Sequence, residues 1–277
     1  MSVLLALASA ALYGGADFLG GLASRRAGTI SVVVWSQASG LVILLLAMPL
    51  LPEASPSRAD LFWGAVAGVA GSAGVGLLYR ALAIGTMAVV APITAVCAVV
   101  IPVLAGVLGG ERLEVLTMAG IVIAIAAIVL VSQERGITHV RRKGIGIAFL
   151  SGVAIGFFFL ALARTGAAAG MWPLVASRAT SLVLFGTIGI VAGQRFAMAL
   201  SVARITLGAG VVDMAANALY LAATRYGPLS VVVTLASLYP ASTVILARVI
   251  LGERLSRWQI AGVASALAAI AMIVRSG

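Results

Sequence analysis

Three polar side chains recur at helical spacing inside one long apolar segment of the chain. Asp213, Asn217 and Tyr220 are four and then three residues apart, so on a helix they share one face. A charged side chain at the centre of a bilayer costs about 2.5–3.5 kcal/mol on insertion scales, so it needs a partner or a function. Asp213 therefore predicts an inward-facing site that binds amino or hydroxyl groups, or that takes up a proton. A permanent ion pair with an arginine is the structural alternative.

Two further charged residues interrupt other apolar segments. Arg178 lies too deep in its segment to reach the surface easily, and it could hold a carboxylate through two parallel hydrogen bonds. Asp17 lies near the end of the first segment, and Tyr13 precedes it by one helical turn. Asp17 could bind a substrate or a proton. The alternatives are a structural pair for Arg178 and an extended Asp17 side chain that reaches the arginines at 25–26.

Aromatic side chains could form an apolar wall for a bulky substrate group. The candidates are Trp35, Tyr79 and the phenylalanine run 157–159, from which we select Phe157 as a cavity residue. Three consecutive residues cannot all face one way on a helix, so at least one phenylalanine must face lipid or a neighbouring helix. Ordinary packing is the alternative for each of these rings.

The composition excludes a water-soluble fold. Of 277 residues, 62% are hydrophobic and 9% are charged, whereas a soluble domain has roughly 25% charged residues. The apolar stretches are continuous rather than alternating, which favours helices over barrel strands. A spanning helix needs about 20 apolar residues, and the polar breaks delimit ten such stretches: 2–22, 29–51, 60–82, 88–109, 115–132, 144–165, 171–193, 201–224, 229–251 and 257–275. The sequence thus predicts an all-α integral membrane protein with ten transmembrane helices.

The net charge of +10 does not indicate a nucleic-acid partner, because the basic residues lie in the loops, where membrane proteins keep them. Cys97 is the single cysteine and His139 the single histidine, so neither a disulfide framework nor a cysteine-based metal site is predicted. We expect no cofactor and no metal ion.

The chain contains an internal duplication. Gly-Glu-Arg-Leu at 110–113 returns at 252–255, an offset of 142 positions. The same offset relates Ser9 to Ser151, Gly14 to Gly156 and Gly85 to Gly227. Because each half has five spans, the second half enters the membrane from the opposite side, which predicts two inverted repeats. The predicted units are a first repeat at 1–132, a basic linker loop at 133–143 and a second repeat at 144–277.

Single residues within the segments predict local features. Glu111 and Glu253 lie where a helix begins, a favourable position for an acid, so we interpret both as structural. Pro92 and Pro102 in the fourth segment, and Pro240 in the ninth, favour kinks. The spacing of the glycines at 64 and 68 is typical of a helix-packing face in lipid.

Ten spans in two inverted halves, with a Gly-Glu-Arg-Leu turn between the fourth and fifth spans of each half, resemble the EamA family of the drug/metabolite transporter superfamily. The resemblance covers essentially the whole chain. It implies a secondary transporter that exports small metabolites, amino acids among them, by alternating access through a central cavity between the repeats. Carriers of nucleotide sugars, lipid-linked sugars or cationic drugs are the alternative within the superfamily. An enzyme is not predicted, because no nucleophile and base converge in the sequence.

The chain departs from the family pattern at one position. Family members often carry an arginine early in spans two and seven. Arg178 fits the seventh span, whereas the matching position in the second span is Gln37, because 37–42 aligns with 178–183. Only one half could then anchor a substrate carboxylate, and Gln37 joins the candidate cavity residues. Small relatives in the superfamily use an acid in the first span for proton-coupled export, which implies a similar role for Asp17.

The resemblance also implies a multi-pass protein of the bacterial plasma (inner) membrane, with a small-molecule substrate and protons as a candidate coupling ion. We expect a monomer rather than an obligate oligomer. The distribution of basic residues favours a cytoplasmic linker and external termini. Relatives are usually described with cytoplasmic termini, so the orientation stays open at this point.

Overall fold

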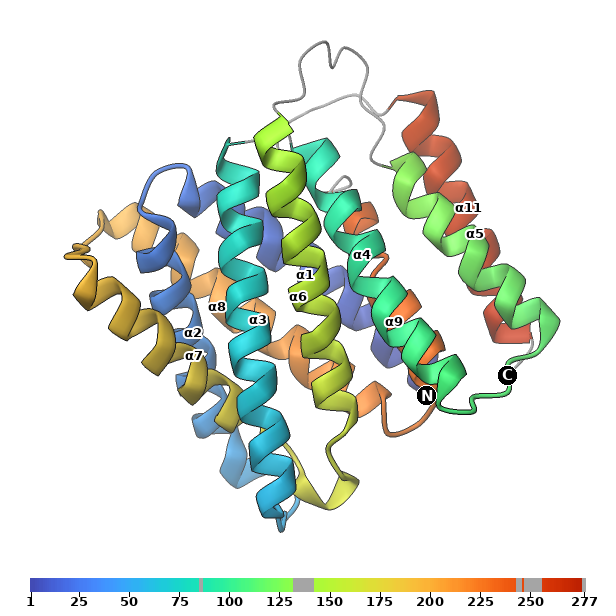
Figure 1. Ribbon diagram of the computed structural model, residues 1–277, viewed down its shortest axis with the longest axis horizontal. Coiled ribbons are helices and arrows are strands. Elements are labelled where there is room, and N and C mark those ends of the chain that lie inside the picture. The colour runs from blue at the N-terminus through green and yellow to red at the C-terminus, as the bar shows by residue number, and fades with distance from the viewer. Residues whose placement is uncertain (85–86, 132–141, 243–245, 247–255, 276–277) are drawn as a thin grey trace.

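Helices account for the whole fold in the described part of the chain. The computed structural model describes residues 1–277 except 85–86, 132–141, 243–245, 247–255 and 276–277 (Figure 1). The first half contains α1 (Ser2–Ser24), α2 (Thr29–Ala47), a 3-10 turn η1 (Met48–Leu50), α3 (Arg58–Ile84), α4 (Met87–Leu108) and α5 (Val115–Val131). The second contains α6 (Arg142–Ala163), η2 (Ala167–Ala169), α7 (Trp172–Val191), α8 (Leu200–Ala223), α9 (Leu229–Ala236) and α11 (Arg257–Arg275).

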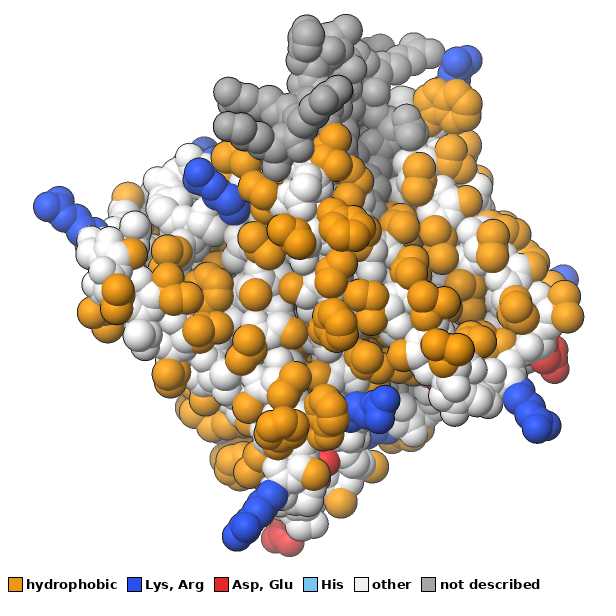
Figure 2. All heavy atoms as spheres, in the orientation of Figure 1, with side chains coloured by type: hydrophobic (Ala, Val, Ile, Leu, Met, Phe, Trp, Pro, Cys, Tyr) orange, Lys and Arg blue, Asp and Glu red, His pale blue; other side chains and the backbone are white. Residues whose placement is uncertain are grey.

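The chain is an all-α integral membrane protein, as predicted. Within the described ranges, six helices are long and apolar enough to cross a bilayer, namely α1, α2 extended through η1, α3, α6, α7 and α8. Shorter apolar helices occupy the remaining predicted segments. Apolar side chains cover the face shown in Figure 2, and basic side chains project mainly from the ends of the helices. This distribution matches a protein whose middle contacts lipid and whose ends contact water.

The ninth segment is interrupted where the proline predicted a kink. α9 ends at Ala236, four residues before Pro240. Pro240 has no N–H to donate to that carbonyl, and its ring would collide with it. The amide of Leu238 instead donates to Leu235 O at 3.2 Å, and helical residues resume at Tyr239. By contrast, α4 runs without interruption from Met87 to Leu108 despite its two prolines.

Two hydrogen bonds establish the inverted symmetry of the halves. Ser9 Oγ donates to Ala216 O at 2.8 Å, and Ser151 Oγ donates to Gly74 O at 2.8 Å. Both ends of one bond are related to both ends of the other by the 142-residue offset. The contact of α1 with α8 is therefore repeated as the contact of α6 with α3. α1 begins and α11 ends at the same end of the bundle (Figure 1), as two halves with five spans each require.

Close helix packing depends on glycine in both halves. A Cβ on Gly64 would lie 2.5 Å from Pro173 O, and a Cβ on Gly68 would collide with Ser177 O. The predicted glycine face of α3 thus packs against α7. Its symmetric counterpart is Gly210 on α8, where a Cβ would collide with Ser36 O on α2. In lipid, such close backbone approach replaces the hydrophobic effect as the force between helices.

α5 and α11 pack against each other at one edge of the bundle (Figure 1). Both helices therefore lie away from the centre of the bundle. His139, Glu253 and most of the predicted linker at 133–143 lie outside the described residues.

Candidate functional site

A pocket lies between the two halves near the middle of the helices. The empty space within its outline is about 590 Å³, and part of that volume is open solvent. The lining comes from α1, α2, α3, α6, α7, α8 and Tyr239 just beyond α9. Among the described residues, α4, α5 and α11 contribute none.

Six of the nine predicted site residues line this pocket: Tyr13, Asp17, Gln37, Arg178, Asp213 and Asn217. The structure places the other three elsewhere. Trp35 is 43% exposed and donates its indole N–H to Phe196 O at 2.9 Å. Phe157 is 52% exposed and points out of the bundle. Tyr79 is buried against α1, where its ring occupies the space that a Cβ on Gly20 would need.

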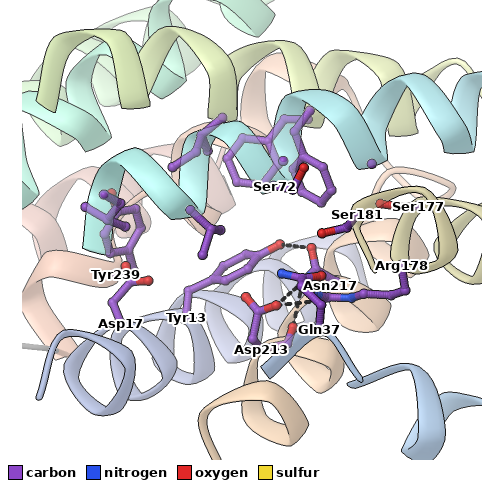
Figure 3. A pocket seen from close by; sticks show the side chains of 17 residues that line it. Tyr13, Asp17, Gln37, Ser72, Ser177, Arg178, Ser181, Asp213, Asn217 and Tyr239 are labelled. Atoms are coloured by element: carbon purple, nitrogen blue, oxygen red, sulfur yellow. Dashed lines mark hydrogen bonds and ion pairs between the residues drawn. The ribbon is translucent and has the colours of Figure 1, made fainter. Parts of the chain in front are cut away.

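A hydrogen-bonded network joins four helices at one side of the pocket (Figure 3). Arg178 on α7 donates to the Asp213 carboxylate on α8 and to Gln37 Oε1 on α2. Asn217 Nδ2 donates to Asp213 Oδ2 at 3.1 Å, and Tyr13 Oη on α1 donates to Asn217 Oδ1 at 2.8 Å. The structural alternative for Asp213, an ion pair with Arg178, is therefore present. The pair has its neighbouring polar groups satisfied, which a buried charge pair requires.

The network lies on the symmetry axis between the repeats. Gln37 and Arg178 occupy matching positions of their halves, and they contact each other directly. Two repeat-related side chains can meet only near the axis that relates them. A ligand held here contacts both halves, so its binding responds to their relative position.

Asp17 lies at the opposite end of the pocket, beside Tyr239 (Figure 3). Among the described residues, the sole ion pair is the one between Arg178 and Asp213. One interpretation of the sequence had the Asp17 side chain reaching the arginines at 25–26. The structure shows no ion pair between Asp17 and either arginine. One guanidinium and two carboxylates line the pocket, which gives the lining a formal charge of −1.

The pocket has two chemically different walls. The polar wall consists of Tyr13 and Asp17 on α1 with Asp213 and Asn217 on α8. The lining on α3 and α6 forms an apolar wall in which Ser72 is the one polar side chain; its other members are Gly68, Gly71, Val75, Leu78, Ile155, Phe158 and Phe159. Phe159 also packs against Tyr13 and Tyr220, with ring centroids 5.9 and 4.5 Å apart. This aromatic contact connects the two walls.

Comparison with known proteins decides the family. The EamA-like transporter family matches residues 1–133 and 142–275. The chain belongs to the EamA-like transporter family. It is thus a multi-pass membrane transporter of the drug/metabolite transporter superfamily rather than an enzyme. A solved structure described as "Crystal structure of protein" has a TM-score of 0.75 and 16% identity, over 99% of this chain and 97% of that one, which shows a shared fold. A search of curated proteins found no match.

Several lining residues of this EamA-family protein were not predicted from the sequence. Phe158, not Phe157, faces the pocket, because the phase of α6 selects one ring of the run. Ser177 and Ser181 are one helical turn apart on α7 and flank Arg178, a spacing that could have been recognised. Tyr239 lies just beyond the α9 break, so its direction depends on the interrupted helix.

The Ser181 hydroxyl differs from that of Ser72, which also lines the pocket. Ser181 Oγ is buried and has no hydrogen-bond partner among the described residues. Ser72 Oγ, on the neighbouring helix α3, donates to Val69 O at 3.2 Å within its own helix. A buried hydroxyl without a partner loses roughly 1–3 kcal/mol relative to one that is satisfied. Ser181 therefore offers a polar contact to whatever fills the pocket.

Proposed function

We propose that this protein is a secondary transporter that exports small amino acids or closely similar metabolites by alternating access through the central pocket. The observation that carries the proposal is the pairing of a charged wall with an apolar wall at the interface of two inverted repeats. A zwitterion with an apolar side chain has the matching pattern, with charges on one face and hydrocarbon on the other. The pocket is complete within one chain, which supports a monomer, and we place it in the plasma (inner) membrane of a bacterium.

The charges of the lining favour one orientation of such a substrate. Asp213 already neutralises Arg178, so a substrate carboxylate would use the remaining guanidinium donors and the Ser181 hydroxyl. Asp17 has no countercharge in the described residues, so it is available for the substrate ammonium or for a coupled proton. The substrate side chain would then lie against Val75, Ile155 and Phe158.

The formal charge of −1 also ranks the alternatives. A nucleotide sugar or a lipid-linked sugar would bring phosphate charge into a lining that is already negative, and repulsion would oppose its binding. A cationic amphiphile would instead compensate Asp17 and use the apolar wall. We therefore keep a cationic drug as the second candidate substrate.

Purified protein in sealed liposomes tests the proposal. The liposomes are loaded with amino acids, amines and other small metabolites, and efflux is followed by mass spectrometry with and without a pH gradient. Selective loss of a few amino acids, accelerated by the gradient, is the expected result. Efflux of amines alone would favour the second candidate, and retention of the entire mixture would overturn the proposal.

Two carboxylate variants supply the control. Asp213→Asn changes the network in the pocket, whereas Glu114→Gln makes the same chemical change on an exposed loop residue. We expect Asp213→Asn to abolish efflux in a protein that still folds, with a lowered unfolding midpoint because Arg178 loses its partner, and Glu114→Gln to retain both. Full efflux by the Asp213→Asn variant would show that transport does not depend on the Asp213 carboxylate.

A further inference from the structure

The turn at 110–113 places a carboxylate of the first half on a helix of the second half. Glu111 Oε1 accepts a hydrogen bond from the Leu229 amide at 2.7 Å. Glu111 Oε2 accepts bonds from the Ser230 amide at 3.2 Å and from Ser230 Oγ at 2.5 Å. These amides begin α9, where no carbonyl of the helix itself can satisfy them. Glu111 thus caps α9, and not α5, the helix that follows it in the sequence.

Two glycines make this contact possible. Gly110 has φ +94°, a conformation that other residues rarely adopt, and it turns the chain back against α4. The Glu111 amide then donates to Gly106 O at 3.0 Å. A Cβ on Gly106 would lie 2.6 Å from both Glu111 Oε2 and Ser230 Oγ. The carboxylate and the start of α9 therefore meet directly over the backbone of α4.

α9 connects this contact to the pocket. Its residues from Ser230 to Ala236 are all buried, and its eight residues span about 12 Å of helix rise. The Glu111 cap holds one end of the segment. At the other end the helix breaks at Ser237, and Tyr239 lines the pocket. Because α9 is short and fully packed, a displacement of its first residues would move its last residues and Tyr239 as well.

Other contacts at the same end also join the two halves. Asp60 Oδ1 accepts a hydrogen bond from the Gly166 amide at 2.7 Å, and the Ser55 amide donates to Ala168 O at 2.9 Å. Each bond pairs the first half with the second, near the end that carries the termini. These two bonds attach the start of α3 and the chain before it to the connection between α6 and α7, whereas the Glu111 bonds attach the end of α4 to α9.

We propose that the Glu111 cap on α9 is a latch between the halves, which closes the pocket at the end carrying the termini and releases when the pocket opens there. The inference rests on the proposed alternating access, but it concerns the conformational change and not the substrate. The three bonds to one carboxylate make Glu111 the strongest of the contacts at this end. Its removal shifts the equilibrium towards the state that is open at the terminal end.

A distance measurement between the halves tests the latch without any substrate. Spin labels are placed at Arg112→Cys and Tyr226→Cys, both exposed positions at this end, in a Cys97→Ser background. Glu111→Gln is compared with Glu114→Gln, a matched change on an exposed residue of the same loop. Weakening hydrogen bonds to a charged group should raise the ratio of long to short distances roughly tenfold in Glu111→Gln, and Glu114→Gln should leave the distribution unchanged. Superimposable distributions in the two variants would overturn the latch.

Ser230→Ala keeps the test decisive if Glu111→Gln does not fold. It removes the hydroxyl donor but keeps both amide donors, so we expect a shift in the same direction and of smaller size. Failure of the latch and failure of the proposed function remain distinguishable. A shifted distance without amino-acid efflux would support the latch and reject the proposed substrate. Amino-acid efflux with an unshifted distance would support the proposed substrate and reject the latch.

Discussion

The two walls of the pocket occupy equivalent positions in the two repeats, yet they differ in chemistry at every matched pair. Asp213 and Asn217 on α8 correspond to Gly71 and Val75 on α3. On the partner helices, Tyr13 corresponds to Ile155 and Asp17 to Phe159. All eight residues line the same pocket. The duplication therefore supplied one backbone arrangement twice, and the side chains that line the pocket diverged into a polar and an apolar wall.

The framework behind the walls has kept its symmetry. The Ser9 bond to Ala216 is repeated by the Ser151 bond to Gly74 with the same length. Close approach of helix backbones is likewise repeated at Gly68 and Gly210. The proposed alternating access would use this symmetric framework, because equivalent contacts let the halves exchange roles, whereas asymmetric walls would allow a ligand to bind in only one orientation. The comparison predicts that wall substitutions change transport and framework substitutions change stability.

The largest expected effect is the loss of the Arg178 charge. Arg178→Gln leaves the Asp213 carboxylate, whose side chain is 14% exposed, without its partner, and removing one member of a buried pair costs about 3–5 kcal/mol of stability. We expect a large fall in the thermal unfolding midpoint together with loss of transport. The double variant with Asp213→Asn should recover much of the midpoint but not the transport. Recovery of both would make the pair purely structural.

Asp17→Asn should abolish transport with little effect on folding. The carboxylate has no ion-pair partner among the described residues, so its removal breaks no salt bridge and lowers the electrostatic penalty of a charge within the bundle. The unfolding midpoint and the efflux of the preferred substrate are measured side by side. A marked fall in the midpoint would show that Asp17 stabilises the fold instead of contacting a ligand.

Ser181→Ala should weaken substrate binding roughly tenfold, because one hydrogen bond to the ligand is worth about 0.5–1.5 kcal/mol and more when it is charged. Ser72→Ala is the matched control, since the Ser72 hydroxyl already bonds within its helix. Binding is measured as the concentration dependence of transport, at constant maximal rate. Equal effects of the two variants would leave no special contact for Ser181.

The smallest effect concerns the framework. Ser9→Ala and Ser151→Ala each remove one buried hydrogen bond, and each should cost about 1 kcal/mol. Because the two bonds are equivalent, the losses of stability should be equal within error, with transport by the remaining folded protein unchanged. Clearly different unfolding midpoints would show that the two bonds have the same geometry but contribute differently to stability.

The sequence predicted most helix ends to within a few residues. Continuous apolar runs of about bilayer length leave few alternatives, since every backbone polar group in lipid must be satisfied within its own segment. The α9 break was predictable from Pro240 because proline removes a specific donor. The inverted relation of the halves was likewise predictable, because the Gly-Glu-Arg-Leu turn recurs at matching places and each half has an odd number of spans.

The site was predictable only where charge made a residue conspicuous in an apolar segment. Asp17, Arg178 and Asp213 are of this kind, because lipid penalises each of them strongly. Aromatic residues carry no such signal, so Trp35 and Phe157 were selected although their helices turn them outward. Tertiary structure alone decided that Arg178 pairs with Asp213 and that Glu111 caps α9. Both contacts join residues from different helices, and only the packing of helices against one another brings such residues within hydrogen-bonding distance.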